Sequence, residues 1–197
     1  MKLLDIYIDY NIYMEAEIFW IRHGESVANT FNYLHSLVLD PGLTNLGKKQ
    51  MLDLAKNIVN ENIEIIICSP LQRSIESGQI IKSYIETIHK SSPKICVSNT
   101  IKESGLGLDN IALYKTDNII NKLINFSPFS FYHSFYQLLE NVMKENKKIL
   151  IIGHQNVNSK YIQLLTSITI EPMKNGDIIK INVNKNKEYI LEKILKK

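Results

Sequence analysis

The sequence predicts an α/β protein, a three-layer α/β/α sandwich in which helices cover both faces of a largely parallel central sheet. Short apolar runs rich in β-branched residues recur along the chain, and amphipathic segments of helical periodicity separate them. The runs lack a polar residue at every second position, which indicates strands that are buried on both faces. Strands that alternate with helices in this way are typical of parallel sheets.

The strands are expected where the apolar runs lie. The first run, Ile18–Ile21, stops at Arg22, His23 and Gly24, and a glycine at such a place lets the backbone turn tightly or approach a ligand closely. The dipeptide Asn175-Gly176 predicts a turn before the last two strands. The expected strands span 18–21, 64–68, 94–97, 149–152, 177–183 and 189–192.

The helices are expected between these strands. Ser26 is the expected N-cap of the segment that follows the first strand, and Asp40-Pro41-Gly42 predicts the turn that ends this segment. Thr44 is the expected N-cap of a helix whose apolar residues from Met51 to Ile58 share one face. Further helices are expected over 71–84, 111–123, 131–144 and 157–165.

We expect a single domain over residues 1–197, because a chain of this length buries about 70% of its unfolded surface. No repeat or low-complexity linker interrupts it. Residues 1–15 fit two interpretations. They are either a strand that forms a hairpin with the next segment, or an N-terminal extension in front of a true start at Met14.

The composition narrows the classes of function. A net charge of +3 is too small to indicate binding to nucleic acid or to a membrane surface, and no apolar stretch approaches the length of a membrane span. Asp5 and Asp9 interrupt the place where a signal peptide needs an apolar core. Cys68 and Cys96 lie in apolar runs without metal-ligand spacing, so we expect reduced core cysteines, a cytoplasmic protein, no metal and no cofactor.

Reactive side chains follow the predicted strands at their carboxyl ends. These ends meet at one edge of a parallel sheet, where open α/β sheets place their ligand sites. We therefore expect one crevice that contains Arg22 and His23 after the first strand, Arg73 after the second, Glu103 after the third and His154 after the fourth.

This combination of side chains suits a phosphoryl group. Guanidinium forks and a helix N-terminus bind its oxygens, a neutral imidazole attacks phosphorus, and a carboxyl group transfers protons. Each residue alone has an ordinary explanation, since a helix-start arginine is usually exposed and a histidine after an apolar strand is usually structural. The repetition at successive strand ends favours the functional interpretation. Cys68 as a nucleophile is disfavoured, because nothing near it in sequence predicts a lowered thiol pKa.

Five motifs, in order along residues 17 to 165, resemble those of the histidine phosphatase superfamily, the phosphoglycerate-mutase-like family. The first resembles RHGE[ST]xxN, the second LTxxGxxQ, the third SPLxRxxxTA and the fourth ExxxG, while the fifth resembles the segment of the second catalytic histidine. They correspond here to 22–26 with Asn29, 43–50, 69–78, 103–107 and Gly153-His154.

The resemblance implies a role for each matched residue. His23 would be the phosphorylated nucleophile and Glu103 the general acid and base. Arg22, Arg73 and His154 would bind the phosphoryl group and stabilise its transition state, with Asn29 assisting. The implied partner is a small phosphorylated substrate, with a phosphoprotein as the alternative.

Three departures from the family pattern affect the substrate pocket. Gln155 stands where most members have glycine. A glutamine at this position is similar to the fructose-2,6-bisphosphatase branch. Leu108-Asp109 replaces a tryptophan that often follows ExxxG, and residues 131–134 replace a GES motif. A metal-independent phosphatase is the favoured expectation, ahead of a phosphoglycerate mutase, whose extra segments are missing. A catalytically silent phospho-ligand-binding member ranks last, because His23, Arg73, Glu103 and His154 are all present.

Overall fold

The computed structural model describes residues 15–30, 40–90, 92–103 and 128–195. A six-stranded sheet forms its centre, with the strand order β3-β2-β4-β1-β5-β6. The predicted α/β class is confirmed, since the neighbouring strands β3, β2, β4 and β1 pair in parallel and only the pairings β1/β5 and β5/β6 are antiparallel. The strands are β1 (Ala16–Arg22), β2 (Ile65–Cys68), β3 (Lys94–Val97), β4 (Lys148–Gly153), β5 (Ile178–Val183) and β6 (Tyr189–Leu195).

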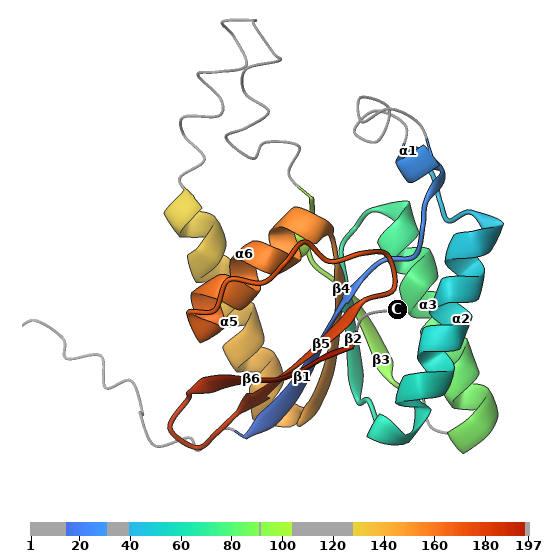
Figure 1. Cartoon of the computed structure of the whole chain (residues 1–197). Helices are drawn as coiled ribbons and strands as arrows, with labels where there is room; N and C mark the ends of the chain where they lie inside the picture. The colour runs from blue at the N-terminus through green and yellow to red at the C-terminus, as the bar shows by residue number, and fades with distance from the viewer. Residues whose placement is uncertain (1–14, 31–39, 91, 104–127, 196–197) are drawn as a thin grey trace, which may run out of the picture.

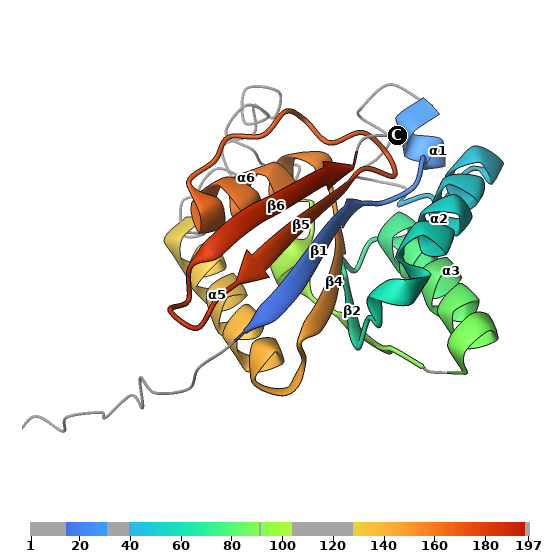
Figure 2. The ribbon, with the colours of Figure 1, turned by 60° about the horizontal axis from the view of Figure 1, so that its bottom comes forward.

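Helices cover both faces of this sheet, as Figures 1 and 2 show. Helices α2 and α3 pack on one face, and α5 and α6 pack on the other. The helical elements are α1 (Val27–Thr30), α2 (Asn45–Ile58), α3 (Gln72–His89), α5 (Pro128–Glu145), α6 (Gln155–Thr166) and the 3-10 turns η2 (Val59–Glu61) and η3 (Asn99–Ile101).

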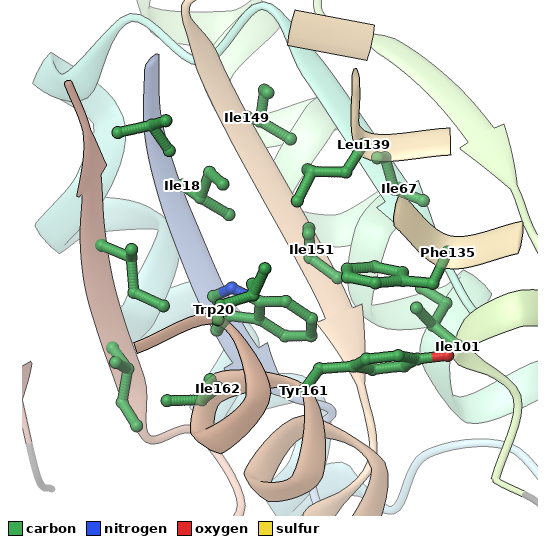
Figure 3. Packing of buried hydrophobic residues seen from close by; sticks show 14 of the residues in the cluster. Ile18, Trp20, Ile67, Ile101, Phe135, Leu139, Ile149, Ile151, Tyr161 and Ile162 are labelled. Atoms are coloured by element: carbon green, nitrogen blue, oxygen red, sulfur yellow. The ribbon is translucent and has the colours of Figure 1, made fainter. Parts of the chain in front are cut away.

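The two helical layers give the protein two hydrophobic clusters, one on each side of the sheet. Alternate residues of β1 serve the two sides, so Ile18 and Trp20 face α5 and α6 whereas Phe19 and Ile21 face α2 and α3. Trp20 is fully buried and lies beside the rings of Phe135 and Tyr161 (Figure 3). Burial of each such side chain stabilises the fold by about 1.5–3 kcal/mol.

The sheet register places the predicted reactive residues next to one another. Arg22 pairs with Gly153 across β1 and β4, so His23 and His154 are the first residues beyond two neighbouring strands. The backbone N–H of His23 donates to the carbonyl of Gly153 at 3.2 Å. On the other side of β4, Ser69 leaves β2 and donates its backbone N–H to Ile152 at 3.1 Å.

Two helix boundaries differ from the sequence prediction. Helix α3 continues to His89 because its apolar stripe continues through Ile85, which is buried, and the helix ends where Lys90 adopts a left-handed φ of 55°. Helix α5 begins at Pro128, three residues before the expected start at 131, since proline lacks only an N–H that the first helical turn leaves unbonded. The expected helix over 111–123 and the hypotheses on residues 1–14 lie outside the described residues.

The two cysteines are free and face opposite sides of the sheet. Cys68 is fully buried, and burial raises the pKa of its thiol to about 12, which disfavours a thiolate nucleophile. Cys96 is only half-buried, at the margin of the α5/α6 side. Within the described part of the chain, no helix has the length and apolarity needed to cross a membrane.

Candidate active site

The carboxyl-end edge of the sheet brings together the reactive residues that the sequence singled out. His23 follows β1, His154 follows β4, Arg73 lies in the first turn of α3, and Glu103 follows η3. The two histidines and Arg73 are each at most 2% exposed, so they form a buried cluster. Glu103 is the partly exposed member of the set, with 19% of its side chain accessible.

His23 presents an unprotonated Nε2 to this cluster. Its Nδ1 donates a hydrogen bond to the carbonyl of Gly24 at 2.7 Å, which fixes the proton on Nδ1. Arg73 Nε donates to His23 Nε2 at 3.2 Å, so the lone pair of Nε2 faces a guanidinium group. Burial and then Arg73 lower the pKa of His23 to about 3, and the ring is therefore neutral at pH 7.

The guanidinium of Arg73 connects three side chains. Besides its bond to His23, Nη2 donates to Glu103 Oε2 at 2.9 Å, and Nη1 lies 3.5 Å from Asp40 Oδ1. Both carboxylate oxygens of Asp40 also accept from the backbone N–H of Gln72 at 3.0 Å. Asp40 therefore caps α3, whose own N-cap residue, Leu71, makes no side-chain cap.

His154 completes the cluster from the opposite side. Its ring centroid lies 5.0 Å from that of His23, with an edge-on interplanar angle of 61°. Nδ1 is 3.4 Å from Glu103 Oε2, and Nε2 is 2.8 Å from the hydroxyl of Ser69. Burial, followed by His23 and the two arginines, lowers the pKa of His154 well below its usual value.

The loop that carries Glu103 is fixed to the core just upstream. Ile101 is fully buried in the cluster on the α5/α6 side. Tyr161 of α6 donates its hydroxyl proton to the carbonyl of Thr100 at 2.6 Å, and its ring stacks on Phe135 with centroids 3.9 Å apart. These contacts set the position from which Glu103 reaches Arg73.

Arg22 and Asn29 lie at the same edge, where a loop between α6 and β5 holds them. Arg22 Nη1 donates to the carbonyl of Met173 at 2.8 Å. Asn175 Nδ2 donates to the carbonyl of His23 at 2.8 Å and approaches Asn29 Oδ1 at 3.4 Å. These contacts brace the backbone on both sides of His23.

Asn29 also orders the start of α1. Its Oδ1 accepts from the backbone N–H and the hydroxyl of Ser26, both at 3.0 Å. Ser26 directly precedes α1, as expected of an N-cap, but its hydroxyl donates to Asn29 Oδ1, the same oxygen that accepts from its backbone N–H. The contacts of Asn29 within the described residues are with the loop and not with the two imidazoles.

Two glycines allow the loop after β1 to pack on the start of α2. A Cβ at Gly24 would lie 2.5 Å from the carbonyl oxygen of Gly47, and a Cβ at Gly47 would overlap the carbonyl of Glu25. Thr44, the N-cap predicted from the sequence, accepts from the N–H of Gly47 at 3.0 Å and donates to Glu25 Oε1 at 2.8 Å. This close approach fixes the segment that carries His23.

Three residues of the site escaped the sequence prediction. Asp40 and Asn175 were visible only as members of turn signals. Ser69 was visible as the residue after a strand and as the first residue of the segment 69–78, without a role of its own. Their contacts with Arg73, His23 and His154 join segments that lie far apart in the chain. Gly105, Gly107, Leu108 and Asp109, which bear on the ExxxG motif, lie outside the described residues.

The arrangement contains the kinds of group that phosphoryl transfer uses. It offers a neutral imidazole with an unprotonated Nε2, a guanidinium that contacts both this imidazole and a carboxylate, and a second imidazole. Among the described residues, no group of three or more His, Cys, Asp or Glu side chains is arranged to hold a metal ion.

The α/β fold matches that of phosphoglycerate-mutase-like structures. Residues 18–95 match the model of the histidine phosphatase superfamily (branch 1). The chain is therefore similar to this superfamily over that segment, and its fold is similar to that of phosphoglycerate-mutase-like structures. No curated protein sequence matches the chain.

Several solved structures share the fold over nearly their whole length. Phosphoglycerate mutase from Bacillus anthracis str. Sterne has a TM-score of 0.69 and 17% identity, with 93% of this chain and 94% of that chain covered. Phosphoserine phosphatase from Entamoeba histolytica, in complex with 3-phosphoglyceric acid, has a TM-score of 0.64 and 21% identity, with coverages of 92% and 98%. The protein histidine phosphatase SixA, complexed with tungstate, has a TM-score of 0.63 and 15% identity, with coverages of 91% and 96%.

Proposed function

We propose that the protein is a phosphatase that hydrolyses phosphate monoesters through a phosphohistidine on His23, without a metal ion. The observation that carries this proposal is the contact of one guanidinium, that of Arg73, with both His23 Nε2 and Glu103 Oε2. A nucleophile, an anion-binding group and a proton donor thus lie within hydrogen-bonding reach of one another.

In the first step, the phosphoryl oxygens replace the Glu103 carboxylate on Arg73, with Arg22 and His154 as further donors. His23 Nε2 attacks phosphorus and forms a P–N bond, while the bond from phosphorus to the ester oxygen breaks. Glu103, in its carboxylic acid form, gives its proton to the leaving oxygen, so an alcohol departs.

In the second step, water attacks the phosphorus of the phosphohistidine. The Glu103 carboxylate takes a proton from this water, the P–N bond breaks, and inorganic phosphate is released. Asn29 contributes through the loop that it braces around His23.

The substrate class of the proposal is a small phosphorylated molecule. Among the structures with this fold, the E. histolytica phosphatase was solved with 3-phosphoglyceric acid. SixA is a protein histidine phosphatase, so a phosphoprotein is the alternative substrate. Gln155, at the first position of α6 beside His154, is the residue through which we expect substrate preference to differ from that of most members.

The test compares His23→Ala with His89→Ala, which removes an exposed histidine at the end of α3. With p-nitrophenyl phosphate in the presence of EDTA, His23→Ala should lose turnover, and His89→Ala should match the wild type. Wild-type protein quenched during turnover should carry an acid-labile, base-stable phosphoryl group on His23. Near-wild-type activity of His23→Ala would refute the mechanism.

A second assay on the wild-type protein distinguishes a phosphatase from a mutase. We expect 3-phosphoglycerate, supplied with catalytic 2,3-bisphosphoglycerate, to yield free phosphate if it reacts. Rapid formation of 2-phosphoglycerate with little free phosphate would instead identify a mutase.

A further inference from the structure

Ser69 contacts the site, but the proposed reaction gives it no role. It follows β2 directly and is fully buried, as is His154. Its hydroxyl oxygen lies 2.8 Å from His154 Nε2. A buried imidazole has one proton to place when it is neutral, and the partner of one ring nitrogen decides which nitrogen holds it.

The hydrogen bonds around Ser69 indicate the direction of this contact. Its hydroxyl oxygen accepts from the backbone N–H of Leu71 at 3.3 Å, which leaves the hydroxyl proton to be donated. The neighbouring carbonyl of Ile152 already accepts from the Ser74 hydroxyl at 2.6 Å. Within the described residues, His154 Nε2 is the acceptor in reach of the Ser69 proton, which favours an unprotonated Nε2.

The other nitrogen of the ring points to the same assignment. His154 Nδ1 is buried and makes no hydrogen bond to the described residues, and Glu103 Oε2 lies 3.4 Å from it. An unprotonated Nδ1 would set its lone pair against a carboxylate oxygen, whereas an N–H there is attracted to it. Both ends of the ring therefore favour a proton on Nδ1.

We propose that Ser69 is a positioning residue that holds His154 as the neutral Nδ1–H tautomer, which leaves this N–H, on the side of Glu103, for the phosphoryl oxygens. The part of the inference that concerns phosphoryl oxygens rests on the proposed function. The tautomer itself does not. His154 then contributes a neutral donor, and the fixed ring keeps this donor aimed before substrate arrives.

The direct test is the ¹⁵N NMR spectrum of wild-type protein with labelled histidine at pH 7. The chain has five histidines, and His154→Gln identifies the His154 signals by their loss. We expect the shift of an unprotonated nitrogen for Nε2 and that of a protonated nitrogen for Nδ1. A protonated Nε2 would overturn the inference, whatever the activity of His23→Ala.

The variant Ser69→Ala tests the role of the hydroxyl. The two ¹⁵N shifts of His154 should move toward each other as the second tautomer becomes populated. The kcat for p-nitrophenyl phosphate should fall about tenfold, the effect of one hydrogen bond, with a smaller change in KM. Ser69→Thr, which keeps a hydroxyl, should restore the shifts. Ser159→Ala, which removes a half-buried hydroxyl bonded to a carbonyl of the same helix, should leave them unchanged. Wild-type shifts in Ser69→Ala would overturn the inference.

Discussion

The substitution Glu103→Gln separates the two roles that the proposal gives to this carboxyl group. In the described structure, Glu103 Oε2 accepts from Arg73 and lies within 3.4 Å of His154 Nδ1. A phosphate bound to Arg73 has to displace this carboxylate. As the proton donor, the same group accelerates the departure of the leaving oxygen. Loss of the charge should therefore strengthen anion binding and weaken catalysis.

The expected magnitudes follow from the contacts. A hydrogen bond between charged groups contributes about 1.5–3 kcal/mol, and the partial exposure of Glu103 favours the lower end. Since about 1.4 kcal/mol corresponds to a factor of ten, Glu103→Gln should bind inorganic phosphate about tenfold more tightly. Loss of a general acid should lower kcat for p-nitrophenyl phosphate by about 10² to 10⁴.

The assay uses two substrates that differ in their leaving group. Dinitrophenolate departs without a proton, so kcat for 2,4-dinitrophenyl phosphate should fall much less than kcat for p-nitrophenyl phosphate. Asp40→Asn is the matched control, because Asp40 also lies beside Arg73 but has no proposed proton-transfer role. It should strengthen phosphate binding without a dependence on the leaving group. An equal loss of kcat for both substrates in Glu103→Gln would refute Glu103 as the acid.

Two further expectations concern stability and positioning. The pKa of His23 is lowered from 6.5 to about 3. Between these two pH values, the unfolded chain binds a proton at His23 and the folded protein does not. Stability is therefore lost as the pH falls below 6.5, by about 2 kcal/mol between pH 7 and pH 5 from this group. Urea denaturation should show this, and an equally steep loss in His23→Asn would contradict it. Tyr161→Phe removes the bond to Thr100 and should cost about 1 kcal/mol of stability. Its kcat should fall through misplacement of Glu103, and an unchanged kcat would argue against this anchoring.

The sheet and the reactive residues were predictable because hydrophobic patterning reports them directly. Apolar runs marked β1, β2 and β4, and parallel topology then required that His23 and His154 share an edge. Helix ends were less certain, because a proline such as Pro128 suits a first turn as well as a loop.

Contacts between residues that lie far apart in the chain leave no pattern in the local sequence. Asp40 caps a helix that begins 32 residues later, and Asn175 binds the backbone of His23 from 152 residues away. Their sequence neighbourhoods indicate turns, and turns are common. Ser69 shows the same limit, because its partner His154 lies 85 residues further along the chain.

The central position of β4 has a consequence for the order in which the strands and the site residues come together during synthesis. In the finished sheet, β4 separates β1 from β2, although it leaves the ribosome long after both. The earlier strands therefore lack their shared neighbour until residue 153 has been synthesised, and an N-terminal fragment ending at residue 103 should show little strand content by circular dichroism. Since the same insertion delivers the second imidazole, His23 and His154 should come together only when β4 joins β1 to β2.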